Sequence, residues 1–265
     1  MLDEIRRTCA DIAAGARHVR LNPGACTVTG GRSGLDPEVH LLDASPEEIA
    51  HYVLVLDATN FGSGWFGELG VDTDVLTRRL TEHVRRGGEA RDAAAIFGLD
   101  PAHELTRLYD EALAQLGAWL GGRPALEAIG DGAEELVRSL SRMPSFRDPG
   151  FSKRAQITAN DLVLAGVAAF EDVDRLTVFA DNLLPHVLRL DGVLVYDDEL
   201  SARVDAGEEL PHGSRMEREI RACAVHACEI IARNLGVPER ILDNWLWNLG
   251  TTLPPGAHVT RTTAY

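Results

Sequence analysis

Two charged residues in one stretch of the chain have the types and surroundings that favour chemistry. Lys153 is the only lysine in the protein, and every other cation within the Lys+Arg total of 26 is an arginine. A lysine kept in so arginine-rich a chain indicates a task that needs a compact ammonium with a movable pKa. Chance drift accounts for the composition equally well. Asp181 follows 28 residues downstream.

Asp181 lies in an apolar run, LTVFADNLLP, at residues 176–185. A carboxylate set among phenylalanine and leucine either caps a helix or is a catalytic group tuned by its surroundings. The residues alone leave both interpretations open. Either one requires the elements around the run to hold this carboxylate in place.

The same residues carry a family resemblance. Lys153 opens the motif KRAQI, and Asp181 closes a Phe-Ala-Asp motif that is followed by Pro-His-Val-Leu at 185–188. With these motifs the chain resembles the queuosine salvage proteins, which are queuosine 5′-phosphate N-glycosidases. Further similar segments keep the family's order, at 56–61, 195–200, 219–221, 243–247 and 258–265. Together these segments are specific to the family, whereas no single segment is.

The resemblance implies an enzyme that hydrolyses the N-glycosidic bond of queuosine 5′-monophosphate and releases the base queuine for salvage. Breaking such a bond builds positive charge on the sugar, and a carboxylate beside the anomeric carbon stabilises that charge. The resemblance gives Asp181 this role. The 7-deaza base lacks the nitrogen at which a purine leaving group is usually protonated, so the enzyme must act from the sugar side. Lys153 could pair with Asp181 and keep it ionised, or contact the 5′-phosphate.

The chain also supplies candidates for stacking on the base, for bonding its edge and, in segments that resemble the family, for binding the phosphate. In that order they are Phe61, Trp65 and Trp245; Asn60, Asp198 and Asp243; and Arg221, His258 and Arg261. The aromatic and glycine-rich residues 57–67 make a poor helix and a poor strand. Without the resemblance, a loop whose rings plug the core is the favoured interpretation of that segment.

No metal or cofactor is expected. The four cysteines form no CxxC pair, which is unlike a zinc site and is typical of reduced, buried thiols. The acidic cluster 197–199 has the pattern of a helix N-terminus. Gly30–Gly34 lacks the Gly-Lys-Ser/Thr ending of a phosphate loop and is interpreted as a plain loop. We expect His226 to be a satisfied core residue.

The formal net charge of −15 argues against a nucleic-acid partner, because nucleic-acid binders need cationic surface. A small anionic ligand remains compatible with a local cationic site. The charged N-terminus is unlike a signal peptide, and no segment has the length and hydrophobicity of a membrane span, so we expect a cytoplasmic protein. Two other functions stay open: a non-catalytic binding protein for a modified base or nucleoside, and a DNA glycosylase-like repair enzyme. The negative charge opposes the second.

Apolar spacing predicts a mainly α-helical protein with few short strands. We expect a single queuosine-salvage domain over 1–265, with a possible helical sub-lobe at 70–145. The tail 251–265 is rich in threonine, proline and glycine, which is typical of a mobile end, whereas the resemblance implies that it folds back toward the site. The main helices are expected at 2–19, within 72–120, and at 153–169, 176–188, 215–235 and 238–249, with a short strand or extended link at 192–196.

Overall fold

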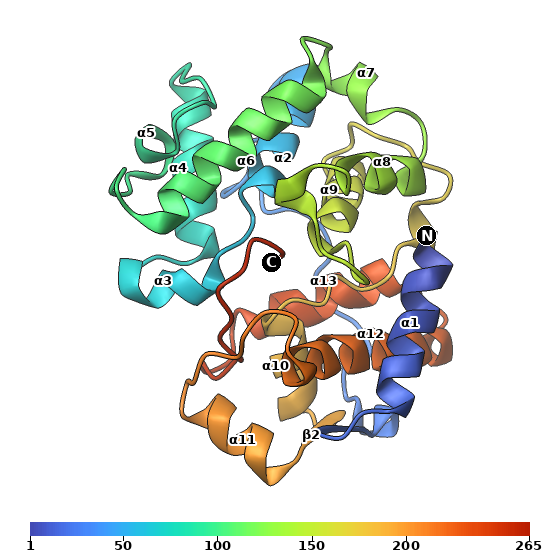
Figure 1. Cartoon of the computed structure of the whole chain (residues 1–265). Coiled ribbons are helices and arrows are strands. Elements are labelled where there is room, and N and C mark those ends of the chain that lie inside the picture. The colour runs from blue at the N-terminus through green and yellow to red at the C-terminus, as the bar shows by residue number, and fades with distance from the viewer. The chain divides into compact units, whose positions relative to one another are not determined.

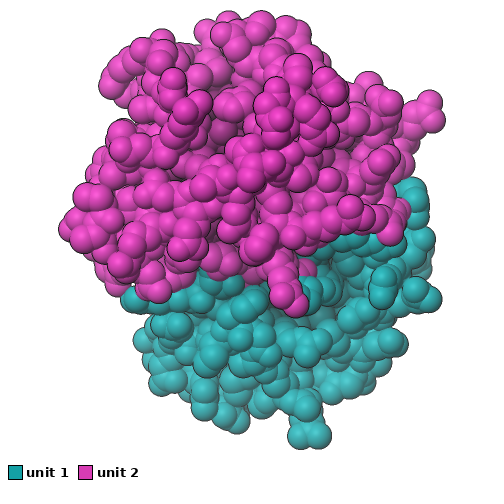
Figure 2. Space-filling view, turned by 45° about the horizontal axis from the view of Figure 1, so that its top comes forward, with its two compact units in different colours: residues 1–33, 149–153, 174–262 teal, residues 34–148, 154–173, 263–265 magenta.

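The structure is a computed structural model that describes all 265 residues, and it divides into two compact units (Figure 2). Unit 1 comprises residues 1–33, 149–153 and 174–262, and unit 2 comprises 34–148, 154–173 and 263–265. Thirteen α-helices and two short strands confirm the mainly α prediction (Figure 1). The expected sub-lobe at 70–145 falls within unit 2, and the single domain stays a prediction.

Unit 1 is built around its longest helix, α12 (Arg215–Leu235). Ser214 caps its first turn and Gly236, in a left-handed conformation, ends it. Its neighbours in unit 1 include three helices and two strands. They are α1 (Leu2–Ala14), α10 (Leu183–Leu190), α13 (Glu239–Gly250), β1 (Val19–Leu21) and β2 (Leu194–Tyr196). The strands pair antiparallel, and α11 (Asp198–Asp205) follows β2.

Unit 2 is built around α2 (Pro46–Ala58). Ile49, Ala50 and every residue from Tyr52 to Ala58 are buried. A helix that is apolar on most sides belongs in a core. Ser45 and Glu48 bond reciprocally at its start and form a capping box. The other helices are α3 (Ser63–Leu69), α4 (Thr73–Arg85), α5 (Ala93–Phe97), α6 (Glu104–Leu120), α7 (Ala125–Ile129), α8 (Ala133–Leu140) and α9 (Lys153–Leu164), whose first residue belongs to unit 1.

The helix predicted at 176–188 is wrong over its first half. Residues 176–180 have no regular secondary structure, and α10 begins only at Leu183. Side chains of other elements satisfy the backbone of this segment: Asp243 accepts from the amide of Phe179, and Arg221 donates to the carbonyl of Ala180. Because buried backbone groups need partners of some kind, these bonds replace the helical ones.

Several smaller expectations need adjustment. The N-terminal helix ends at Ala14, and the chain after it forms β1. The segment expected to be irregular after Phe61 contains α3, and α9 ends at Leu164. His226 is half-buried at the surface of α12, so its prediction as a core residue is wrong.

The C-terminal tail is packed from His258 onward, where most of its residues are buried. The amide of Leu210 donates to the carbonyl of Val259, and the hydroxyl of Thr260 donates to the carbonyl of Leu210. In unit 2, the carbonyl of the last residue, Tyr265, accepts from the amide of Gly62. None of the helices combines the length and the apolar character that crossing a bilayer requires.

Candidate functional site

Lys153 and Asp181 form an ion pair inside unit 1. The Nζ of Lys153 lies 3.9 Å from Oδ2 of Asp181, and the two side chains are only 5% and 12% exposed. Lys153 is the first residue of α9, whereas Asp181 precedes α10. Two segments 28 residues apart in sequence therefore bring together the two residues that were predicted to be catalytic.

The second oxygen of Asp181 fixes the orientation of the carboxylate. Oδ1 accepts hydrogen bonds from the amides of Leu183 at 2.8 Å and Leu184 at 3.0 Å, at the start of α10. These are amide groups that a helix leaves without internal partners. Asp181 is thus a helix-capping residue through Oδ1, and it presents Oδ2 to Lys153.

A buried guanidinium supports the residue before Asp181. The Nε of Arg221 donates to the carbonyl of Ala180 at 2.9 Å, and its Nη1 lies 3.3 Å from Oε1 of Glu217, one turn earlier on α12. The guanidinium also lies over the ring of Phe151, 4.0 Å from the centroid. Arg221 is 1% exposed. This cation braces the protein around Asp181 and is turned away from solvent.

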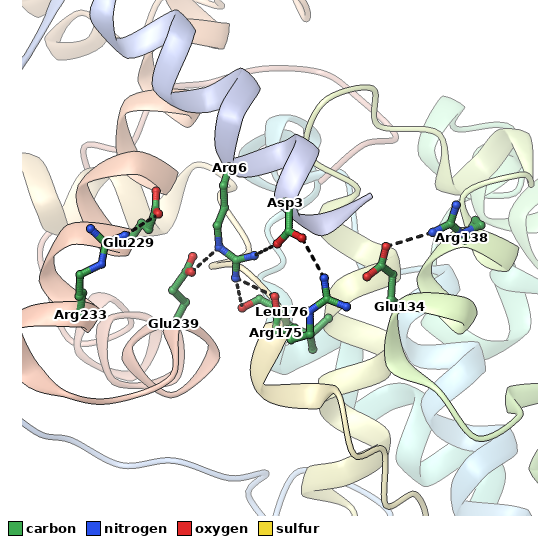
Figure 3. A network of polar contacts seen from close by, with 9 residues as sticks. All are labelled: Asp3, Arg6, Glu134, Arg138, Arg175, Leu176, Glu229, Arg233 and Glu239. Carbon is green, nitrogen blue, oxygen red and sulfur yellow. Dashed lines mark hydrogen bonds and ion pairs between the residues drawn. The ribbon is translucent and has the colours of Figure 1, made fainter.

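Two further side chains hold the segment that leads to Asp181. Oδ1 of Asp243, on α13, accepts from the amide of Phe179 at 2.7 Å. Arg6, on α1, donates to the carbonyls of Arg175 and Leu176 and pairs with Glu239 at 2.7 Å (Figure 3). The position expected to bond the edge of a base, Asp243, therefore has a bond to the backbone of the candidate site.

Among the histidines of unit 1, His258 lies within reach of the charges of Asp181 and His186. Burial lowers the pKa of His258 to about 4, against the opposing charge of Glu217, and the charge of Asp181 also reaches it. His258 is therefore neutral at pH 7 and is a poor partner for a phosphate. The Nε2 of His186 lies 2.9 Å from the carbonyl of Pro254. Gly256 allows this approach, because a Cβ there would lie 3.0 Å from the His186 ring.

Three of the expected base contacts belong to unit 2. The ring of Phe61 is 3% exposed and meets the edge of Tyr109, with centroids 4.9 Å apart, and the guanidinium of Arg154 at 4.6 Å. Trp65 is buried, and its indole nitrogen donates to Glu104. Asn60 is half-buried. The rings of Phe61 and Trp65 lie in the core, as expected for residues 57–67 without the family resemblance.

The remaining expected contacts lie in unit 1. Trp245 is half-buried, and Gly31 packs so closely on it that an added Cβ would come within 2.9 Å. Asp198 is exposed in the first turn of α11, where its neighbour Asp197 caps the helix, which confirms the helix-start interpretation of that cluster. The side chain of Arg261 is 41% exposed and lies 3.6 Å from Glu209.

Several supports of the site, among them Glu217 and Phe151, were not predicted from the sequence. A readable signal existed for the first. Glu217 and Arg221 are spaced four residues apart on the inward stripe of α12, where apolar residues are expected. Charged residues at such positions, at a spacing that allows them to pair, indicate a buried ion pair. For Phe151, nothing in the sequence distinguishes its ring from any other core ring.

A separate hollow of about 560 Å³ lies in unit 1. It is lined by the end of α1, by β1 and β2 and by His226, and its lining includes neither Lys153 nor Asp181. No group of three or more His, Cys, Asp or Glu side chains in the chain is arranged to hold a metal ion. The candidate site consists of the ion pair of Lys153 and Asp181 and its supports.

Comparison with known proteins places these residues in a family. Residues 124–262 match the family described as queuosine salvage protein, a range that contains Lys153, Asp181 and Arg221. The chain is 34% identical to the queuosine 5′-phosphate N-glycosylase/hydrolase of Sphaerobacter thermophilus, over 86% of this chain and 84% of the relative. It is 39% identical to the protein of that name from Dictyostelium discoideum, over 83% and 79%. The chain belongs to the queuosine salvage protein family.

Proposed function

We propose that this protein hydrolyses the N-glycosidic bond of queuosine 5′-phosphate and releases queuine. The observation that carries the proposal is the buried pair of Lys153 and Asp181 in a chain whose relatives bear that activity in their names. Water attacks the anomeric carbon, the bond to the base breaks, and the base leaves with the electron pair and gains a proton. Ribose 5-phosphate is the other product.

Asp181 has the geometry to act on the sugar. Its Oδ1 is held by two amides, so the carboxylate cannot rotate, and its charge lies in a buried setting. A fixed charge that needs no reorganisation is the most effective stabiliser of a developing positive centre. In this proposal, Asp181 stabilises the oxocarbenium-like sugar and orients the attacking water.

Lys153 acts as the partner of Asp181 in this proposal. The separation of 3.9 Å and the burial of both side chains favour pairing over the alternative in which Lys153 only binds phosphate. Its compact ammonium leaves more space at the carboxylate than a planar guanidinium would. This difference gives a physical reason for a single lysine in an arginine-rich chain.

For phosphate binding, Arg261 is the best supported of the three expected cations. Its guanidinium reaches solvent, whereas Arg221 is buried and His258 is neutral at pH 7. For stacking on the base, the half-buried Trp245 is better placed than Phe61 or Trp65, whose rings are packed in the core of unit 2.

A direct assay tests the proposal. Purified protein is incubated with queuosine 5′-phosphate, and free queuine is measured by mass spectrometry, with Asp181→Asn protein as the control. Release that depends on Asp181 supports the N-glycosidase. Tight binding of queuine without any release would favour the non-catalytic binding protein instead, and release of a base from damaged duplex DNA would favour the repair enzyme.

A further inference from the structure

We infer that Arg221 is a positioning residue: its guanidinium ties together the two segments that carry Lys153 and Asp181 and so fixes the geometry of that pair. The inference rests on the proposed function for its catalytic consequence. It departs from the expectation that Arg221 binds the phosphate of the substrate.

The first tie is to the segment of Asp181. The Nε of Arg221 donates to the carbonyl of Ala180 at 2.9 Å. Because the peptide unit is planar, the direction of this carbonyl also sets the direction of the amide of Asp181. A shift of the Ala180 carbonyl therefore turns the carboxylate relative to the start of α10.

The second tie is to the segment of Lys153. The ring of Phe151, two residues before Lys153, lies 4.0 Å from the guanidinium carbon of Arg221. Between them Ser152 has a φ of +50°, and it is the only residue other than glycine with a positive φ. Such a conformation costs about 1 kcal/mol, so the turn requires support from its surroundings. The ring held against Arg221 supplies it.

Glu217 fixes the guanidinium itself. Its Oε1 lies 3.3 Å from Nη1 of Arg221, and its Oε2 accepts from the amide of Gly213 at 3.0 Å. Both charged side chains are buried. A planar guanidinium can stack on a ring and donate along two edges at once, which an ammonium cannot do. The geometry therefore calls for arginine at this position.

The test removes the buried pair as a unit. Arg221→Met combined with Glu217→Gln deletes both charges, because a lone buried carboxylate would destabilise the fold. The matched control is Arg189→Met with Asp205→Asn. Arg189 also lies over a ring, that of Tyr196 at 4.8 Å, and bonds a carboxylate, but at the far end of α10.

Two readouts are taken on protein verified as folded by its unfolding curve. We expect kcat to fall about 100-fold, as for a small misplacement of reacting groups, with KM within a few-fold of wild type. Because Lys153 is the only lysine, feeding ¹³C-labelled lysine gives one lysine side-chain signal in an NMR spectrum. That signal should move toward its position in Asp181→Asn protein, and the control pair should leave both readouts unchanged.

Each outcome decides the matter. Folded protein in which both kcat and the Lys153 signal match wild type would overturn the positioning role, and so would an equal effect in the control pair. A rise in KM with kcat unchanged would return Arg221 to substrate binding. If wild-type protein releases no queuine, the proposed function fails, and the NMR signal still decides whether Arg221 positions Lys153.

Discussion

Each unit of the molecule contains a fully buried arginine that lies against aromatic rings and donates to backbone carbonyls, and the two differ in their partners. Arg221 of unit 1 lies over one phenylalanine, donates to one backbone carbonyl and has a carboxylate partner, Glu217. Arg154 of unit 2 lies between the rings of Phe61 and Phe146, each 4.6 Å away, and donates to two carbonyls at the end of α2. Burial lowers its pKa to about 9.

The difference concerns what each arginine braces. Arg221 bonds the carbonyl adjacent to Asp181, so its loss should be felt in the reaction. Arg154 closes the core of unit 2, and its Nε and Nη2 have no hydrogen-bond partner, so its loss should be felt mainly in stability. We therefore expect the same residue type, at the same degree of burial, to support the candidate site in unit 1 and the fold in unit 2.

Arg154→Lys offers the largest expected effect on stability. The ammonium cannot fill the space between two rings while it donates to two carbonyls, so we expect a loss of about 3 kcal/mol in the free energy of unfolding. Urea unfolding measures this loss. Arg123→Lys is the control, since Arg123 also lies over a ring and bonds carbonyls but is exposed. If kcat per folded molecule fell as far in Arg154→Lys as in the Arg221 and Glu217 double variant, Arg154 would also support the reaction. That result would contradict the distinction between the two arginines.

His258 gives unit 1 a pH dependence of its own. Its pKa is lowered to about 4 in the folded protein from about 6.5 in the unfolded chain. Below about pH 6.5 the unfolded chain takes up a proton at His258 that the folded protein does not. The free energy of unfolding therefore has its full value above about pH 6.5 and decreases as the pH falls toward 4. Between pH 7 and pH 5 the loss should be about 2 kcal/mol. Urea unfolding of His258→Gln protein at these two pH values should show a drop that is smaller by that amount; an unchanged drop would mean that His258 is not the group responsible.

Lys153→Arg should have the smallest effect of the series. The larger guanidinium must fit where the lysine side chain is 5% exposed and paired with Asp181, and we expect kcat to fall about tenfold, equivalent to about 1.4 kcal/mol. Arg86→Lys, at the exposed residue that follows α4, is the control and should not change kcat. Equal activity of the two variants would mean that the lysine at position 153 is retained by chance and has no role that an arginine cannot fill.

The sequence predicted the helical class, and its motifs identified the two residues of the central pair. Periodicity found α12 and α13 nearly to their ends, because their inward stripes are continuous and both helices end at or near glycine. It failed at 176–180, since an apolar pattern does not reveal that Asp243 and Arg221 satisfy the backbone there.

The roles of charged residues are likewise not readable from a sequence pattern. Motif resemblance offered Arg221 and Asp243 as ligands of the substrate, whereas both bond the backbone beside Asp181. A charged residue in a family motif can touch the substrate or hold the residue that does, and a one-dimensional pattern is identical in the two cases. Only burial and partners in three dimensions separate them.

Asp181→Asn tests the central claim most directly. Asparagine keeps an oxygen that can accept from the amides of Leu183 and Leu184, so α10 should form as before while the negative charge is lost. We expect kcat for queuine release to fall about 1,000-fold or more, with queuine binding retained. Near wild-type turnover by this variant would contradict the account.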